Sequence, residues 1–149
     1  MKRRSFIIDC CKGCIAITAI PILFESCSSL TNITGKIVRD GLILNIDEFK
    51  IRDNKNTAFR SFVIVRNESL LYPVCVFRLN NNEYSAVWMK CSHQGAELQS
   101  SGDFLQCPAH GSEFNNKGEV TNGPASQNLK VFPVTINKDE IFIDLRKQS

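Results

Sequence analysis

The sequence contains only two histidines among 149 residues, which excludes any site that needs three or more imidazoles. An excess of one charge is also missing, because 18 Lys and Arg oppose 15 Asp and Glu. Beyond the N-terminus the basic residues are scattered, whereas a phosphate backbone requires a continuous basic stripe. We therefore expect no nucleic-acid partner. The length predicts a single domain without a second catalytic domain.

Hydrophobic runs long enough to span a bilayer are lacking as well. The apolar run at residues 15–24 has about half of the ~20 residues that a spanning helix needs, and Pro21 interrupts it. A basic segment at residues 2–4 precedes this run. The pattern predicts a signal peptide over residues 1–26 in preference to a permanent anchor helix.

The N-terminal segment also indicates a destination. Arg3 and Arg4 resemble a twin-arginine export signal, with the general secretory route as the alternative. Residues 24–27 resemble a bacterial lipoprotein processing site, in which Cys27 becomes the lipidated first residue. We expect a protein exported across the bacterial cytoplasmic membrane and held by this lipid anchor, on the periplasmic side or at the outer membrane. Residues 27–36 are expected to form a tether.

From residue 37 onward, apolar residues alternate with polar ones or form short runs bounded by Asn, Asp and Gly, which is typical of strands. Asn-rich and Asp-containing segments at 80–82 and 137–139 are expected to be hairpin turns. Residues 37–149 therefore predict an antiparallel all-β sandwich, with Cys75 and Trp88 in its core. The expected strands are 42–46, 62–65, 74–77, 84–89, 129–136 and 141–145.

Residues 91–124 differ from the rest, because Gly, Ser, Asn and Pro replace the apolar alternation. A long irregular stretch in a small domain is usually functional. We expect something other than a hydrophobic core to hold it.

Both histidines lie in this stretch, each close to a cysteine. Cys91 and His93 are separated by one residue, and Cys107 and His110 by two. Two thiolates and two imidazoles could bind a tetrahedral zinc, so a zinc-stabilised binding module without redox function is one hypothesis. A single intervening residue, however, tends to direct its two neighbours toward different atoms. A cluster of two metals therefore suits the spacing better.

The pattern C-x-H followed by C-x-x-H-G resembles the Rieske [2Fe–2S] proteins, and the likeness covers roughly residues 62–145. It implies a Rieske-type β-sandwich with a small cluster-binding subdomain formed by loops, at about 88–124, and one [2Fe–2S] cluster per chain. By this resemblance, Cys91 and Cys107 bind the inner iron, and His93 and His110 bind the outer iron at the surface. Further matching positions are Ser112, which in the family bonds a bridging sulfide, and Phe114, Gly118, Gly123, Pro124, Ala125, Leu129 and Val134.

Several positions depart from the high-potential members of that family, which oxidise quinols. Ala96 and Ala109 stand where those proteins carry a disulfide, so no such bond can form here. Gln94 replaces a Leu that shields the cluster, and Phe114 replaces a Tyr that donates a hydrogen bond to a ligating sulfur. These differences argue against a quinol-oxidising subunit of a cytochrome bc complex.

The resemblance predicts a one-electron carrier, or an electron-transfer subunit of a redox complex, that is not itself an enzyme. Its expected partner is a cytochrome, a molybdenum oxidoreductase or a quinol-linked complex. A Rieske oxygenase would need further histidines for its second iron, and the two present are already assigned. A ferredoxin of an oxygenase system is an alternative, although the export-type N-terminus opposes it.

Overall fold

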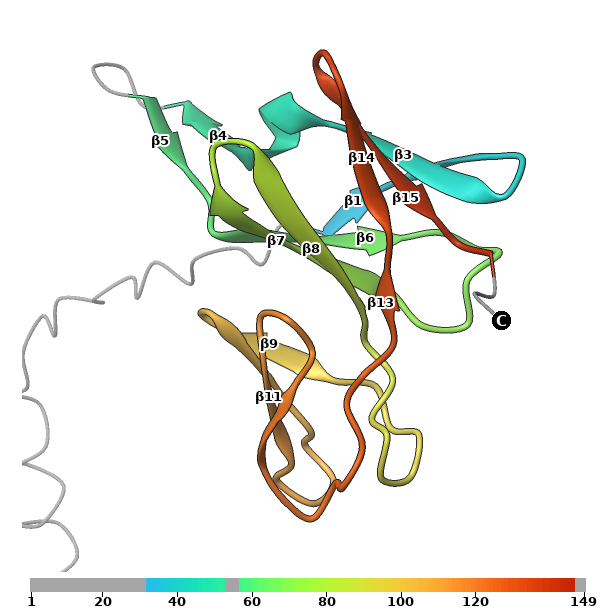
Figure 1. Ribbon diagram of the computed structural model, residues 1–149, viewed down its shortest axis with the longest axis vertical. Helices are drawn as coiled ribbons and strands as arrows, with labels where there is room; N and C mark the ends of the chain where they lie inside the picture. Colours follow the sequence, from blue (N-terminus) through green and yellow to red (C-terminus); the bar gives the residue numbers. More distant parts are fainter. Residues whose placement is uncertain (1–31, 53–56, 147–149) are drawn as a thin grey trace, which may run out of the picture.

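The computed structural model describes residues 32–52 and 57–146, and these ranges contain strands but no α-helix (Figure 1). A short 3-10 turn, η1 (Ile46–Phe49), is the only helical element in them. The all-β class is thus confirmed. The strands are β1 (Asn32–Thr34), β2 (Lys36–Val38), β3 (Gly41–Asn45), β4 (Lys50–Arg52), β5 (Thr57–Phe59), β6 (Phe62–Arg66), β7 (Val74–Asn80), β8 (Glu83–Trp88), β9 (Gln99–Ser101), β10 (Phe104–Gln106), β11 (Glu113–Asn115), β12 (Val120–Asn122), β13 (Val131–Phe132), β14 (Val134–Asn137) and β15 (Glu140–Asp144).

The expected signal peptide, residues 1–26, and the lipidation candidate Cys27 lie outside the described residues. Within the described ranges, no helix has the length and apolar character that crossing a membrane requires.

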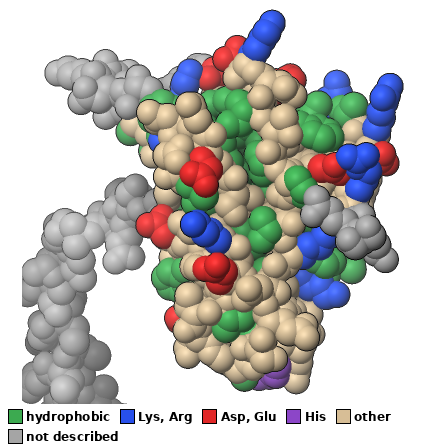
Figure 2. Space-filling view, viewed as in Figure 1, with side chains coloured by type: hydrophobic (Ala, Val, Ile, Leu, Met, Phe, Trp, Pro, Cys, Tyr) green, Lys and Arg blue, Asp and Glu red, His purple; other side chains and the backbone are tan. Residues whose placement is uncertain are grey.

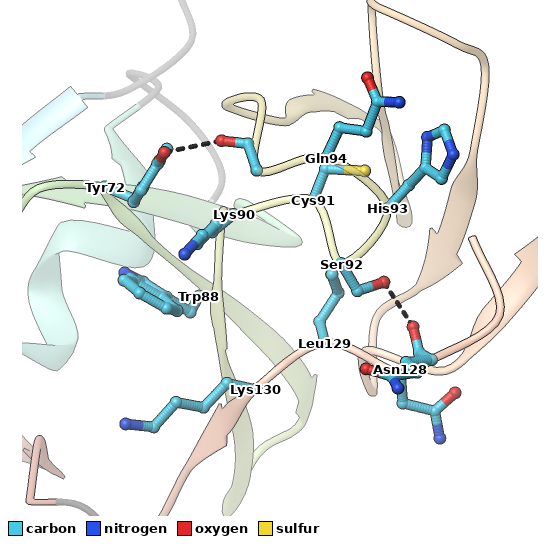
Figure 3. A pocket seen from close by; sticks show the side chains of 12 residues that line it. Tyr72, Trp88, Lys90, Cys91, Ser92, His93, Gln94, Asn128, Leu129 and Lys130 are labelled. Atoms are coloured by element: carbon cyan, nitrogen blue, oxygen red, sulfur yellow. Dashed lines mark hydrogen bonds between the residues drawn. The ribbon is translucent and has the colours of Figure 1, made fainter. Parts of the chain in front are cut away.

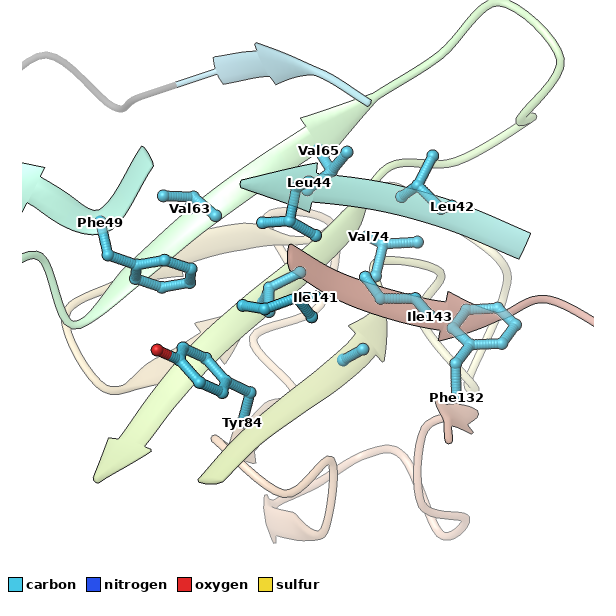
Figure 4. Packing of buried hydrophobic residues seen from close by; sticks show 12 residues of the cluster. Leu42, Leu44, Phe49, Val63, Val65, Val74, Tyr84, Phe132, Ile141 and Ile143 are labelled. Atoms are coloured by element: carbon cyan, nitrogen blue, oxygen red, sulfur yellow. The ribbon is translucent and has the colours of Figure 1, made fainter. Parts of the chain in front are cut away.

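Two sheets form the base of the fold and enclose a first hydrophobic core. One has five strands in the order β1-β6-β7-β8-β13, and the other has the order β14-β15-β3-β2 (Figure 1). Leu42, Val63, Val74 and Ile141 fill the space between the sheets and are fully buried (Figure 4). This arrangement is the β-sandwich that the sequence predicted.

The five-stranded sheet is buried on its other face too. Along β7, Val74 and Val76 contact the first core, whereas Cys75 and Phe77 belong to a second core. Successive side chains of a strand point to opposite faces, so burial of both faces requires a continuous apolar run. Residues 74–77 form such a run for this reason, and Cys75 is the buried thiol that was expected.

The second core joins this sheet to a smaller lobe built on a four-stranded sheet, β12-β11-β10-β9 (Figure 1). Leu105 of β10 and Phe114 of β11 are fully buried in it, and Leu98 and Leu129 are buried beside them. The expectation that residues 91–124 lack a hydrophobic core was therefore wrong. Each strand of the lobe has three residues and directs only one or two side chains inward, too few to produce a visible period.

The N-terminal boundary of the base also differs from the expected one. Residues 32–36 were assigned to a tether, but β1 pairs with β6 and Lys36 begins β2. The β1–β6 pair is parallel, so the sandwich is not wholly antiparallel. Asn67 supports this junction by donating a side-chain hydrogen bond to the Gly35 carbonyl (2.9 Å). A three-residue polar strand shows no alternation from which it could be predicted.

One predicted strand is in fact two. Residues 129–136 divide at Pro133, with β13 pairing with β8 in the first sheet and β14 pairing with β15 in the second. Proline has no N–H to donate to a ladder, so the chain changes sheets at this position. The segment from β13 to β14 thereby links both sheets.

Both predicted hairpin turns are present. Asn80 pairs with Glu83 across the first turn, and Asn137 pairs with Glu140 across the second. In the second turn Lys138, rather than Asn or Asp, adopts the left-handed conformation, with φ of 55°.

Candidate functional site

Two loops of the same backbone design form the tip of the molecule. In the first, the Cys91 N–H donates to the Ala96 carbonyl (2.8 Å) and the Gly95 N–H donates to the Cys91 carbonyl (2.9 Å). In the second, the Cys107 N–H donates to Ser112 (2.8 Å) and the Gly111 N–H donates to Cys107 (2.9 Å). Each loop therefore begins at a cysteine and closes by the same pair of hydrogen bonds.

A glycine at the same position makes each of these turns possible. Gly95 and Gly111 both have φ of 77°, a left-handed conformation that side chains with a Cβ rarely adopt. The sequence spacing Cys-x-x-x-Gly in both loops is therefore a requirement of the backbone.

Strands anchor both loops to the sheets described above. The first loop follows β8 and is closed by a bridge between Lys90 and Glu97. The second joins β10 to β11, where Gln106 pairs with Glu113. The two cysteines consequently start from rigid positions rather than from free chain.

The four predicted ligands come together as two pairs. The Cys91 and Cys107 side chains are buried, with only 2% and 1% of each residue exposed, and their thiols hydrogen-bond to each other. His93 and His110 are exposed, with ring centroids 5.0 Å apart and planes at 88°. A histidine is visible at the lower tip of the lobe in Figure 2. The site thus has sulfur inside and imidazole at the surface.

The surroundings of Cys107 favour a thiolate. Burial raises the pKa of this thiol. Hydrogen bonds from the backbone N–H groups of Ala109 and His110 and from the Cys91 thiol lower the pKa, and together they outweigh the effect of burial. The net pKa lies below the ordinary value, and the thiolate is the form that binds metals. Cys75 is the opposite case, because burial alone raises the pKa of its thiol.

Ser112 connects the second loop to a third segment. It is fully buried, and its hydroxyl oxygen accepts a hydrogen bond from the Ala125 N–H (3.0 Å). The hydroxyl retains its own proton for donation to another acceptor. Ala125 follows a cis Gly123–Pro124 bond.

The four side chains are divided between the interior and the surface. Over residues 32–52 and 57–146, no group of three or more His, Cys, Asp and Glu is arranged to hold a single metal ion. A tetrahedral zinc requires such convergence of all its ligands. The separation into a buried sulfur pair and an exposed imidazole pair suits a group with two metal atoms.

Sequence reasoning missed the contacts that hold the first loop from outside. The Tyr72 hydroxyl donates to the Gly95 carbonyl (2.6 Å), and the Ser92 hydroxyl donates to the Gln127 carbonyl (2.5 Å) (Figure 3). Tyr72 stands 19 positions before Cys91 and belongs to no motif. Neither bond has a local signal in the sequence, because each joins segments that only the fold brings together.

A cavity of about 540 Å³ lies beside the first loop. Trp88 lines it and is only half-buried, so the expectation that this residue is core was wrong in part. Its ring packs edge-on against Tyr72 with centroids 5.4 Å apart. Trp88 ends a strand whose preceding residues are buried, which is why its apolar run predicted full burial.

The model of the Rieske [2Fe-2S] domain family matches residues 46–133. A similar solved structure is the plasma membrane Rieske protein PetC3 from the cyanobacterium Synechocystis PCC 6803, which is 27% identical with a TM-score of 0.49, over 56% of this chain and 85% of that one. A ferredoxin from Sphingomonas yanoikuyae B1 is 27% identical with a TM-score of 0.45, over 57% and 85% of the two chains.

Part of a larger enzyme shares the fold. Naphthalene 1,2-dioxygenase with indole bound is 20% identical with a TM-score of 0.53, over 73% of this chain and 26% of that one. No curated protein matches the chain by sequence.

Tyr72→Phe should loosen the first loop, because it removes one hydrogen bond while keeping the ring against Trp88. The bond contributes about 1 kcal/mol, so amide hydrogen exchange over residues 91–96 should become roughly fivefold faster. Tyr84→Phe is the matched control, since Tyr84 packs in the first core and its hydroxyl has no partner among the described residues. Equal exchange rates in Tyr72→Phe and the unaltered protein would show that this bond does not restrain the loop.

Proposed function

Because the chain belongs to the Rieske [2Fe–2S] domain family, we propose that it is a non-enzymatic one-electron carrier, or an electron-transfer subunit of a redox complex. The domain binds one [2Fe–2S] cluster. The residues proposed to hold it are Cys91, His93, Cys107 and His110. The observation that carries this assignment is their separation into a buried sulfur pair and an exposed imidazole pair on two matched loops.

The donor set explains the proposed activity. With two thiolates and two neutral imidazoles, an oxidised [2Fe–2S] cluster is formally neutral, so it takes up one electron more readily than a cluster with four thiolates. Cys91 and Cys107 are proposed to hold the inner iron, where burial keeps water from the sulfurs. His93 and His110 are proposed to hold the outer iron, at a surface that a partner protein can contact.

Ser112 is proposed to tune the site. Its hydroxyl already accepts from Ala125, so its proton is directed to a different acceptor, for which a cluster sulfide is suited. Hydrogen bonds to cluster sulfur stabilise the reduced form and raise the potential. Phe114 is buried and cannot add a second such bond.

The alternatives receive less support. Zinc ligand pairs are usually two to four residues apart, whereas a single residue separates Cys91 from His93. A Rieske oxygenase would need further imidazoles, and the sequence has no third histidine. Ala96 and Ala109 leave the two loops without the disulfide of quinol-oxidising members, so we propose a disulfide-less carrier.

The proposed location depends on the N-terminal sequence. We propose export across the bacterial cytoplasmic membrane and attachment by lipid on Cys27, with the domain on the periplasmic side or at the outer membrane. Arg3 and Arg4 support export of a folded, cluster-loaded protein. The partner would then be a cytochrome, a molybdenum oxidoreductase or a quinol-linked complex, whereas an oxygenase ferredoxin would carry no export signal.

Anaerobically purified protein should contain two irons and two acid-labile sulfides per chain, with negligible zinc. His93→Ala and His110→Ala should each lose the cluster, because each removes one of the four proposed ligands. Gln94→Ala alters an exposed neighbour in the same loop and should keep full iron content. Elemental analysis that finds stoichiometric zinc without sulfide would contradict the proposal.

Ser112→Ala should lower the reduction potential measured by protein-film voltammetry. A hydrogen bond contributes about 1.5–3 kcal/mol with a charged acceptor and about 0.5–1.5 kcal/mol with a neutral one, so the Ser112 bond favours the reduced form by about 1–1.5 kcal/mol. A one-electron couple shifts by about 59 mV per 1.4 kcal/mol, so we expect a fall of about 40–60 mV. Ser85→Ala, at a buried serine of β8, should leave the potential unchanged. A potential that is the same in all three proteins would remove Ser112 from the cluster environment.

Replacing Arg3 and Arg4 by Lys should leave unprocessed precursor inside the cell, because the twin-arginine route depends on the arginine pair. Cys27→Ala should release the domain from the membrane, since the lipid is lost. Fractionation and immunoblotting measure both. Membrane-bound mature Cys27→Ala that only detergent releases would exclude the lipid anchor and favour a retained apolar helix.

A further inference from the structure

The cavity beside the first loop has a distinct chemical character. Its walls include the rings of Tyr72 and Trp88, the side chains of Lys90 and Lys130, and the His93 end of the loop (Figure 3). We refer to these five residues as the lysine cleft. No Asp or Glu lines the cavity.

Aromatic rings, not carboxylates, position the two lysines. The Lys90 amine lies 5.3 Å from the Trp88 ring centroid, and the Lys130 amine lies 5.9 Å from the same centroid. The two lysine side chains lie on either side of the ring (Figure 3). Contact with a ring orients a cation but does not neutralise it. Among the described residues neither amine has an ion-pair partner, whereas Lys50, Arg66 and Arg146 are each paired with a carboxylate.

Backbone pairing holds the two segments that carry these lysines side by side. The Trp88 N–H donates to the Lys130 carbonyl (2.9 Å), and Val131 pairs with Val87 in the ladder between β13 and β8. Lys90 follows two residues after Trp88 on the same chain. Lys90 lies just beyond the end of β8 and Lys130 just before the start of β13. Two unpaired cations on these adjoining segments suit several carboxylates of a protein surface better than one small anion.

The cleft adjoins the proposed point of electron exchange. His93 and Cys91 line it directly, so whatever occupies it contacts the loop that presents the exposed imidazole. The positive character is local, because the whole chain carries a formal charge of only +3.

We propose that the lysine cleft docks a carboxylate-rich surface of the protein with which the cluster exchanges electrons. The partner's Asp and Glu side chains reach Lys90 and Lys130, and this contact places its redox centre beside His93. The inference rests on the proposed electron-transfer function and adds the chemistry of the partner surface.

Stopped-flow oxidation of the reduced, cluster-loaded protein tests the local charge. Hexacyanoferrate(III), a trianion, takes one electron from the cluster and becomes hexacyanoferrate(II); tris(phenanthroline)cobalt(III), a trication, does the same with the opposite charge. In the variant Lys90→Gln with Lys130→Gln, the rate with the anion should fall by about three- to tenfold at low ionic strength, while the rate with the cation rises. High salt should abolish both effects.

The control variant carries Lys36→Gln and Lys138→Gln, which remove the same charge from exposed positions on the base. Its rates should stay close to those of the unaltered protein. An equal loss of rate in both variants would assign the effect to the net charge of the protein and would overturn the docking proposal. Iron and sulfide are measured before mixing: absence of the cluster contradicts the proposed function, whereas a loaded protein with unchanged rates contradicts the cleft alone.

Carbodiimide cross-linking of membranes that contain the full chain tests the protein partner. The reagent couples a lysine amine directly to a contacting carboxylate, so Lys90 or Lys130 should become joined to an Asp or Glu of another polypeptide. This product should disappear when both lysines are replaced and persist in the control variant. Absence of any cross-link through Lys90 or Lys130, or its survival in the cleft variant, would overturn the proposal.

Discussion

Burial of the five-stranded sheet on both faces is the constraint on which the rest of this structure depends. Strands β6, β7 and β8 turn alternate side chains into the sandwich and into the lobe, so neither layer can move away without exposing apolar surface. The last residues of β8 lead directly into Cys91. The first loop therefore inherits its position from a strand that two cores hold in place.

The proposed ligands differ in burial. The cysteine sulfurs lie within the second core, and the imidazoles, which water can solvate, lie outside it. Each loop is closed by its own backbone and then attached to a distant segment, through Tyr72 in one case and Ser112 in the other. These hydrogen bonds attach separate stretches of the chain to one site. They matter because Ala96 and Ala109 leave the two loops without a disulfide at these positions.

The lysines beside the site differ in their contacts from the cations that form ion pairs. The ion pairs of Lys50, Arg66 and Arg146 lie at exposed positions, where they contribute little to stability. Lys90 and Lys130 instead contact aromatic rings and keep their charge available at the cavity beside His93. Aromatic contact thus keeps a positive surface next to the proposed point of electron exchange without a dense cluster of basic residues.

The sequence alone determined the all-β class, the hairpin turns and the strands of the double-faced sheet, because continuous apolar runs and turn residues act locally. It also identified the two Cys-His pairs through their spacing and the scarcity of histidine. Only the tertiary structure decided that the lobe has its own core, that β1 joins the sheet, and that Pro133 moves the chain between sheets. The roles of Tyr72, Trp88 and Lys130 were likewise decided there, because hydrogen bonds and ring contacts between segments far apart in the chain leave no periodic signal in the sequence.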